Sequence, residues 1–358
     1  MENREYIVYE QSKEFRIKEV LEEIKKDGSD APEMKLALEI ESQLKDLLAK
    51  FDASGKHILG VVRCWNKNPE ELIQFRERIG SLQKALPELA GVVLVINNEG
   101  EEKSGGKTQN NLSEVNAKYN GDTPILPLTL YNYSWTAGLN GPIAILKRYC
   151  ATKEINTHNQ YVFNFSFDVK FDDVALQKLA ENFRAGKTII TGRGEIAEQS
   201  VSPQDTIKVA HEISQEISQL IHAGSLPDKD FTKVLTLGRN TGSLIKLADL
   251  IALGGFDARC NVLGGMEDQD FWLRKLIAML RASDISGAKD LFRGLRKPIE
   301  FQDSAWNALS PEKKLDKYNK EMASLHKIIE RLVSQHKAGA PIDPEALIVP
   351  IEYRDFNL

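Results

Sequence analysis

Apolar residues in the middle of the chain alternate between short continuous runs and helical stripes. Apolar runs at 58–62 and 91–96 flank a stretch in which apolar residues recur every three or four positions, at Leu72, Phe75, Ile79, Leu82 and Leu86. A run that is apolar throughout predicts a strand buried on both faces, whereas the three- and four-residue spacing predicts an amphipathic helix. The pattern therefore predicts a strand–helix–strand unit of a parallel sheet that is covered on both faces.

The same alternation continues along the chain and predicts an α/β fold, with a mostly parallel sheet flanked by helices. Further strands are predicted at 161–165 and 188–192, and further helices at 135–150, 173–184 and 205–223. Residues 99–122 are rich in Gly, Asn, Ser and charge, which predicts a surface loop or a mobile lid. Residues 244–250 lead into the glycine pair at 254–255.

Both ends of the chain carry helical patterns. Residues 36–51 place one apolar stripe on a helix, and residues 315–332 carry a heptad-like seam that is too short for an independent coiled coil. We therefore expect helical extensions over 1–52 and 306–358 around a single α/β domain at 53–305. Packing of the terminal helices on this domain is favoured, and a homodimer formed through them is the alternative.

Composition excludes several classes of function. The chain has 358 residues, with 47 Lys and Arg against 52 Asp and Glu, and its net charge of −5 disfavours nucleic acid as a partner. Its three cysteines form no C-x-x-C pair, so neither a zinc ribbon nor a disulfide framework is indicated. The sequence shows no secretory signal and no apolar window of about 18 residues, so we expect a soluble, cytoplasmic protein without an integral membrane segment.

Polar residues follow the predicted strands, at the edge where an open α/β sheet binds its ligands. These segments are 63–66, 97–99 and 166–168, and their composition suits a nucleotide lying across the strand ends. Further along, Gly264 and Gly265 precede Glu267, Asp268 and Asp270 at the start of a predicted helix. A helix dipole favours acidic residues in the first turn, but it does not explain why a second Gly-Gly pair lies ten residues earlier. Glycine pairs let the backbone approach a ligand closely.

These motifs resemble those of the GT-A glycosyltransferases, especially the family-2 type. The late signature of that family is Gly-Gly-Phe-Asp, a short spacer and Gly-Gly-x-Glu-Asp-x-Asp-Phe/Leu-x-x-Arg, and the chain carries all of it from Gly254 to Arg274. Asn66 matches a strand that ends in aromatic-Asn, and Asn97 stands where the family usually has Asp. Residues 138–140 resemble its Ala-x-Asn helix start, with Gly138 in place of Ala. The resemblance implies a Rossmann-like GT-A domain over 53–305.

The Asp-x-Asp element of the family is altered to Ser-Phe-Asp at 166–168. In the family an apolar residue usually follows the second Asp of the element by eight positions. Leu176 lies eight positions after Asp168, so Asp168 matches the second Asp. In the alternative alignment Asp168 matches the first Asp and Lys170 stands at the second. A late His often completes the metal site of the family, and Asp303 is the candidate here. The resemblance thus implies Mn²⁺ or Mg²⁺ held by Asp168 and Asp303. Without a metal, Arg293, Arg296 and Lys297 are the candidate cations for a diphosphate.

The resemblance further implies a hexosyltransferase that moves a sugar from a UDP- or GDP-sugar to a hydroxyl of a sugar or small-molecule acceptor. Asp268 is the expected general base, with Glu267 against the sugar or acceptor. Inversion of the anomeric centre is expected, although related families with an acidic pair at this place retain configuration. The expected donor-binding residues are Arg63, Asn66, Asn97, Asn140, Ser166, Asp168, Gly264, Gly265, Arg293 and Arg296.

Two alternative functions stay open. A catalytically silent GT-A domain used for binding is supported by Ser166, which replaces a carboxylate, and is opposed by the intact Glu267–Asp268 pair. A sugar-phosphate nucleotidyltransferase uses a similar sheet and similar substrates. Such enzymes usually have a glycine-rich loop directly after the first strand, and this chain has Arg-Cys-Trp-Asn-Lys at 63–67 instead.

Overall fold

A computed structural model gives the fold of the central part of the chain. It describes residues 44–52, 55–64, 66–98, 102–118, 123–131, 136–187, 189–192, 240–257, 267–282, 284, 286–288, 290–291, 299–300, 302–303 and 310–313. The predicted helix at 205–223 and the heptad-like seam at 315–332 lie outside these residues, so both stay predictions, as does the division of the chain into three parts. No helix in the described ranges is long and apolar enough to span a membrane.

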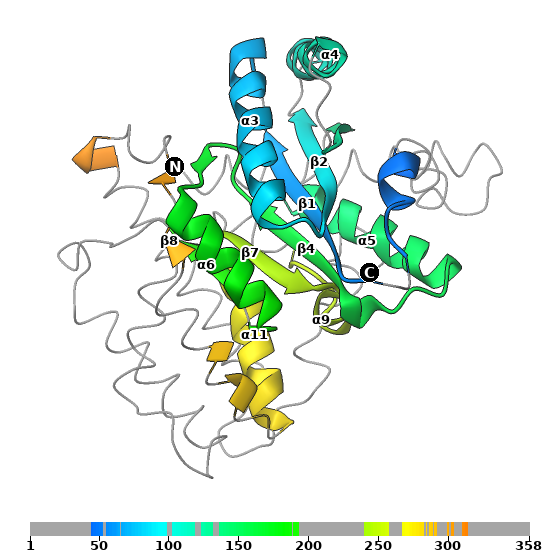
Figure 1. The fold of residues 1–358 in the computed structure, drawn as a ribbon, viewed down its shortest axis with the longest axis vertical. Helices are drawn as coiled ribbons and strands as arrows, with labels where there is room; N and C mark the ends of the chain where they lie inside the picture. The colour runs from blue at the N-terminus through cyan, green and yellow to red at the C-terminus, as the bar shows by residue number, and fades with distance from the viewer. Residues whose placement is uncertain are drawn as a thin grey trace, which may run out of the picture.

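Within the described residues, a seven-stranded sheet in the order β3-β2-β1-β4-β7-β6-β8 forms the centre of the fold (Figure 1). Its strands are β1 (His57–Cys64), β2 (Leu89–Asn98), β3 (Ile125–Tyr131), β4 (Gln160–Phe165), β6 (Ile189–Gly192), β7 (Asn240–Lys246) and β8 (Ile299–Glu300). Strands β3, β2, β1 and β4 run parallel to one another, β8 is parallel to β6, and β7 runs antiparallel to both β4 and β6. This arrangement confirms the predicted α/β class with a mostly parallel sheet.

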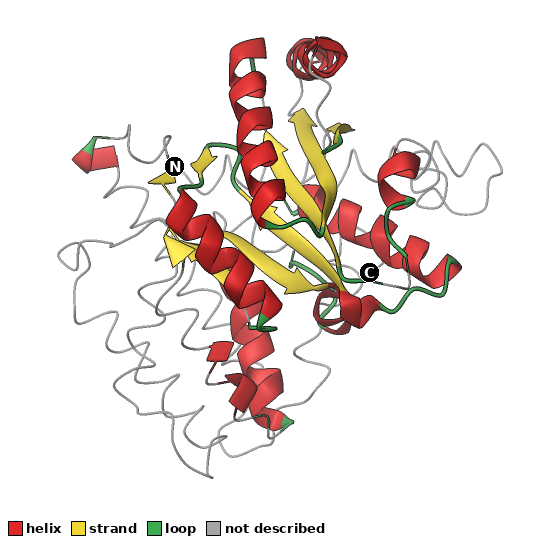
Figure 2. Cartoon of the chain, in the orientation of Figure 1, coloured by secondary structure: helices red, strands yellow, loops and turns green. Residues whose placement is uncertain are grey.

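Helices cover both faces of the sheet (Figure 2). One face packs against α3 (Pro69–Ala85), α4 (Glu102–Lys118) and α6 (Asp173–Arg184). The other packs against a helical turn at 44–48, α5 (Ala137–Thr152), α9 (Leu247–Ala252) and α11 (Glu267–Arg281). A short 3₁₀ helix, η1 (Thr157–Asn159), precedes β4. The run at 58–62 in β1 has no polar side chain because alternate residues point to opposite covered faces, with Val61 in one core and Val62 in the other.

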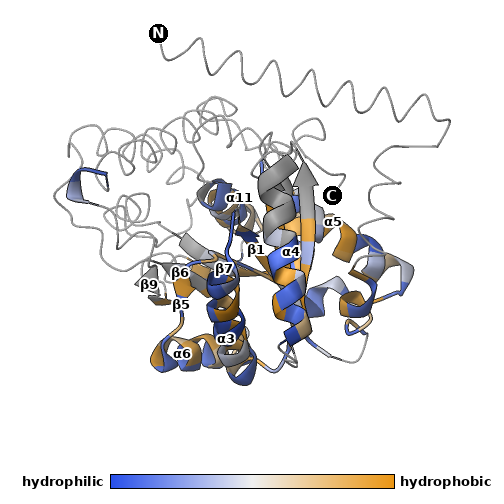
Figure 3. Ribbon diagram, turned by 90° about the horizontal axis from the view of Figure 1, so that it is seen from above, coloured by the Kyte–Doolittle hydropathy of each residue, from blue (hydrophilic) through white to orange (hydrophobic). Residues whose placement is uncertain are grey.

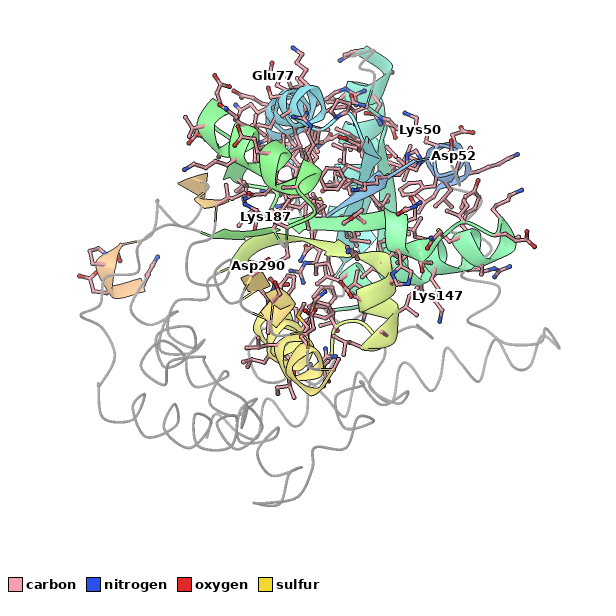
Figure 4. All side chains as sticks on the ribbon, turned by 60° about the horizontal axis from the view of Figure 1, so that its bottom comes forward. Lys50, Asp52, Glu77, Lys147, Lys187 and Asp290 are labelled. Carbon is pink, nitrogen blue, oxygen red and sulfur yellow. The ribbon has the colours of Figure 1, made fainter. Side chains whose placement is uncertain are left out.

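Local signals explain the start of the first long helix, α3. The Asn68 side chain accepts a hydrogen bond from the Glu71 backbone N–H, and the Glu71 carboxylate accepts one from the Asn68 backbone N–H, which makes a capping box. The buried residues of α3 are Leu72, Phe75, Ile79 and Leu82, the same stripe that predicted the helix. In Figure 3, α6 likewise alternates hydrophobic and hydrophilic residues along its length. In Figure 4, side chains fill the space between these helices and the sheet.

The prediction of a loop or lid over 99–122 is wrong, because most of this stretch forms α4. Leu112 and Val115 are buried and lie one turn apart, so α4 attaches to the sheet through a short apolar contact that a search for longer stripes misses. Strand β3 was not predicted either, since Pro127 interrupts its apolar run. Among the described strands β3 lies at the sheet edge, where the missing N–H of a proline is tolerated.

The end of the predicted N-terminal helix packs on the sheet, as expected. Leu44, Leu47, Leu48 and Phe51 are buried in the same core as α5 and α11. A methyl group on Gly91 would clash with Leu47 and with Pro124, so glycine at this place in β2 allows the N-terminal segment to approach the strand closely. The segment at 44–51 therefore belongs to the folded body.

Candidate active site

The N-terminus of α11 meets the carboxyl ends of two neighbouring strands. Arg63 lies near the end of β1, Asn164 lies near the end of β4, and Glu267 and Asp268 begin α11. Because β1 and β4 are parallel, their carboxyl ends lie at the same edge of the sheet. The structure thus brings Arg63, Glu267 and Asp268 together as a site, and it adds Asn164, a polar residue within the apolar run of β4.

Arg63 and Glu267 form an ion pair that is largely shielded from water. The Arg63 Nη1 donates to Glu267 Oε1 at 2.9 Å, and the two side chains are only 13% and 7% exposed. In surroundings with little water, a charged pair of this kind needs both partners, because either alone would be a buried charge. The pair therefore fixes the position of the Glu267 carboxylate at the start of α11.

Asp268 lies beside this pair and has a different environment. Its Oδ1 accepts a hydrogen bond of 3.4 Å from Asn164 Nδ2. Burial and the neighbouring charge of Glu267 raise the pKa of Asp268 to about 7, while Arg63 and the Asn164 hydrogen bond act in the opposite direction. Two adjacent carboxylates are thus set apart: Glu267 has a cationic partner, and Asp268 can take up and release a proton near neutral pH.

The glycine pair at 254–255 forms a turn that α11 holds in place. Gly254 and Gly255 have φ angles of 70° and 75°, a left-handed conformation that favours glycine. Arg274 donates from Nη1 to the Leu253 carbonyl at 2.7 Å and from Nη2 to the Gly255 carbonyl at 2.8 Å. Its Nε donates to the buried Asp270 carboxylate at 2.8 Å. Asp270 and Arg274 of the late motif therefore have a structural role, because they hold the glycine turn.

Asn140 holds the same turn from α5. Its Nδ2 donates to the Phe256 carbonyl at 2.8 Å, and its Oδ1 accepts from the Phe256 N–H at 2.9 Å. The side chain is fully buried, so both ends of this amide are used inside the protein. Asn140 thus joins α5 to the turn before α11, and its contact with a donor stays a prediction.

Gly138 makes room for Arg63. A methyl group at Gly138 would lie 3.3 Å from Arg63 Cγ, Arg63 Cδ and Val95 Cγ1, which is closer than ordinary van der Waals contact. This crowding gives a physical reason for the glycine where the resembling family has alanine. A methyl group at 138 would therefore require the Arg63 stem or Val95 to shift by a few tenths of an ångström.

Asp168 lies at the same strand edge, beside Lys67, a residue that the sequence analysis did not predict as part of the site. Lys67 Nζ lies 3.4 Å from Asp168 Oδ1 and 3.1 Å from Glu71 Oε1, and it stands over the Phe167 ring at 4.5 Å from the centroid. The Asp168 side chain is 39% exposed, whereas that of Lys67 is 15% exposed. A built-in ammonium group therefore faces the carboxylate that was predicted to bind a metal.

The described side chains near Asp168 do not make a donor set that fits a divalent cation. Such a cation takes several hard oxygen ligands, and here Ser166 offers a neutral hydroxyl, while the carboxylates of Asp168 and Glu71 both already face Lys67. Across the described ranges, no cluster of three or more His, Cys, Asp or Glu residues could hold a metal. The backbone of Asp303 does approach, since β9 (Gln302–Asp303) pairs with β5 (Val169–Lys170) and places Asp303 opposite Val169.

The remaining predicted residues are placed only in part. Asn66 follows β1 with an exposed side chain and a φ of 48°, a left-handed conformation that asparagine tolerates better than most residues. Asn97 lies near the carboxyl end of β2, as expected from its strand. The predicted residues Gly264, Gly265, Arg293, Arg296 and Lys297 lie outside the described residues.

Of the two cysteines in the described ranges, the one at this strand edge, Cys64, is not a candidate nucleophile. Cys64 ends β1 and is buried, and burial raises the pKa of its thiol to about 12. A cysteine acts as a nucleophile through its thiolate, which is scarce at neutral pH when the pKa is that high. The described groups at this edge that can act in chemistry are therefore carboxylates and cations.

Comparison with known proteins does not establish a family. No protein-family model matches the chain, and no curated protein matches its sequence. Among solved structures, that of S. aureus TarS 1-349 is similar with a TM-score of 0.31 and 12% identity, over 80% of this chain and 94% of that chain. A likeness at this TM-score carries no argument about fold or function.

Proposed function

We propose that this protein is a glycosyltransferase that moves a sugar from a nucleotide-sugar donor to an acceptor hydroxyl. The observation that carries the proposal is the environment of Asp268, whose pKa is raised to about 7 at the edge of an α/β sheet where ligands bind. A general base is most effective when its pKa lies near the working pH. The resemblance of 254–274 to the GT-A motif, noted from the sequence, supports the same reaction.

In the proposed reaction, the Asp268 carboxylate takes the proton of the acceptor hydroxyl. The acceptor oxygen forms a bond to the anomeric carbon, and the bond from that carbon to the diphosphate oxygen breaks. The bonding electrons leave with the nucleoside diphosphate. Attack from the face opposite the leaving group inverts the anomeric centre. In this proposal Glu267, held by Arg63, contacts the sugar or the acceptor through its remaining oxygen lone pairs.

The first test is a thermal-shift screen of UDP- and GDP-sugars, followed by an assay for release of UDP or GDP. A ligand at a hundred times its Kd adds about 2.7 kcal/mol to the free energy of unfolding, which is easily detected. We expect at least one nucleotide sugar to bind and to be turned over. Binding of none, together with no release of nucleoside diphosphate, would contradict the proposal.

Variants of Asp268 connect the activity to the site. Asp268→Asn keeps a side chain that can accept the hydrogen bond from Asn164 but removes the base, so we expect donor binding to persist and transfer to be lost. Asp173→Asn is a matched control, because Asp173 is also an acidic residue in a first helical turn, in α6, and is exposed. Full activity in Asp268→Asn would exclude this residue as the base.

A catalytically silent binding domain is the second candidate, and Ser166 at the strand end favours it. A silent domain would bind a nucleotide sugar in the thermal-shift screen without releasing nucleoside diphosphate. The same two measurements therefore separate it from the enzyme.

A further inference from the structure

We infer that Lys67 is the cation that holds the donor's diphosphate, in place of a divalent metal ion, so that donor binding needs no added metal. This inference rests on the proposed function, because it presumes a nucleotide diphosphate at the strand edge. It starts from the contact between Lys67 and Asp168, which are 101 positions apart in the sequence.

The surrounding structure keeps Lys67 at this place. Its backbone N–H donates to Thr108 Oγ1 at 2.9 Å, and its carbonyl accepts from Asn111 Nδ2 at 2.9 Å, so α4 fixes the main chain. Its ammonium group lies above the Phe167 ring, and cations are attracted to aromatic faces. A lysine that is bound at both its main chain and its side chain presents its charge at a defined point.

The loop that carries Asp168 is also held by a cation. Arg78 Nη2 donates to the Phe167 carbonyl at 2.8 Å, and the Arg78 guanidinium lies 5.8 Å from the centroid of the Phe167 ring. Two cationic side chains from the first βα segment therefore reach residues 167–168. Beside this loop the protein itself thus provides two cations, with the carboxylates of Asp168 and Glu71 next to Lys67.

Lys67 can provide the positive charge that a metal ion would otherwise supply to stabilise the diphosphate leaving group. An ammonium group carries three donors and a compact charge, and charge-assisted hydrogen bonds to phosphate oxygens are among the strong ones. Its partners Asp168 and Glu71 are carboxylates that orient it; their side chains are 39% and 38% exposed, so the lysine is not closed off on their side. Ser166, which replaces a metal-binding carboxylate in the resembling motif, agrees with a site that uses a lysine instead.

The test measures binding of UDP and GDP by calorimetry, first in EDTA and then with Mn²⁺ or Mg²⁺ added. We expect the wild-type protein to bind one of them in EDTA, with a Kd that the metals change less than threefold. Lys67→Met should weaken this binding at least tenfold, and Lys67→Arg, which keeps the charge, should restore most of it. Both variants keep the main-chain contacts, and circular dichroism checks that they are folded.

Lys56→Met is the matched control. Lys56 also stands over an aromatic ring, with Nζ 5.8 Å from the centroid of Phe183, but it precedes β1 and so lies at the opposite end of that strand. We expect this variant to bind the nucleotide like the wild-type protein. Equal weakening in Lys56→Met and Lys67→Met would overturn the inference, because the loss would then not be specific to Lys67.

Two other outcomes overturn the inference, and they are distinguishable. Nucleotide binding that appears only with Mn²⁺ or Mg²⁺, or that is unchanged in Lys67→Met, contradicts the role of Lys67 and leaves the proposed function standing. Absence of UDP and GDP binding to the wild-type protein with and without metal contradicts the proposed function itself, and the inference fails with it.

Discussion

Arg63 and Glu267 are 204 positions apart in the sequence, and their side chains meet at 2.9 Å where β1 ends and α11 begins. Because of this pair, the two adjacent carboxylates at the start of α11, Glu267 and Asp268, have different electrostatic environments. Glu267 has its positive partner, whereas burial and the nearby charge of Glu267 raise the pKa of Asp268. A base and a charged binding group thus arise from neighbouring residues of the same chemical type.

Removing Arg63 should change both stability and the pH dependence of transfer. In Arg63→Met, Glu267 is left without its partner, which costs about 3 kcal/mol of the free energy of unfolding. Arg63 also lowers the pKa of Asp268, so its loss should move the pH midpoint of transfer upward. Urea denaturation and a pH–rate profile measure the two effects.

The double variant Arg63→Met/Glu267→Gln is the control for the ion pair. If the cost of Arg63→Met comes from an unpaired buried carboxylate, neutralising Glu267 should recover much of the lost stability. Additive losses in the double variant would show that the two side chains do not stabilise each other.

Asp268→Asn should make the protein more stable at alkaline pH. The pKa of Asp268 is about 7 in the folded protein and near 3.9 in an unfolded chain. Between these values the folded state holds a proton that the unfolded state has released, so the stability of the wild-type protein falls as the pH rises from about 4 to 7. The variant lacks this loss, so we expect it to be more stable than the wild-type protein at pH 8, by up to about 4 kcal/mol.

Denaturation at several pH values checks this prediction. The stabilities of Asp268→Asn and the wild-type protein should converge as the pH falls to about 4 and below, because Asp268 is then protonated in both the folded and the unfolded state. A variant that is less stable than the wild-type protein at pH 8 would contradict the raised pKa.

Two glycine-to-alanine variants test whether Gly138 makes room for Arg63. Gly80 lies in α3 with nothing within 4 Å of a methyl group at that position, so Gly80→Ala should stabilise the protein by about 0.5–1 kcal/mol through helix propensity. Gly138→Ala should gain less stability, because its methyl group presses on Arg63. It should also slow transfer by about tenfold, since a small misplacement at a site costs that much or more. Equal effects of the two variants on stability and rate would contradict this account.

Asn140→Ala should destabilise the fold without acting on the chemistry. The change leaves the N–H and the carbonyl of Phe256 without their buried partner, which costs about 1–3 kcal/mol for each unsatisfied group. Thermal melts measure the loss, and donor binding well below the melting temperature should stay within about twofold of the wild-type value. A large loss of donor affinity at unchanged stability would instead assign Asn140 to the donor site.

Secondary-structure elements could be predicted from the sequence where an uninterrupted apolar run or a regular apolar stripe spans the whole element. Strand β1, helix α3 and strand β2 follow from continuous runs and a regular stripe, and the structure confirms them. Helix α4 was missed because its buried contact is only about one turn long, and β3 was missed because a proline interrupts it. In both cases packing against the rest of the sheet, and not the local pattern of apolar residues, determines the secondary structure.

The candidate site was predicted as a set of residues but not as a set of contacts. Arg63, Glu267, Asp268 and Asp168 were named from strand ends and a motif, and the structure brings the first three together. Lys67 and Asn164 gave no signal because their partners, Asp168 and Asp268, lie 101 and 104 positions away. The motif also mixes two kinds of residue, since Asp270 and Arg274 hold the glycine turn while Glu267 and Asp268 face the strand ends.

The pH dependence of sugar transfer tests most directly whether Asp268 is the base. The quantity to measure is the apparent kcat/KM for the donor at saturating acceptor. It should rise tenfold per pH unit at acidic pH and level off with an apparent pKa near 7. Asp173→Asn should follow the same curve, and Asp268→Asn should show no transfer at any pH. A wild-type profile that is flat between pH 5 and 8, or transfer by Asp268→Asn at the wild-type rate, would contradict the account.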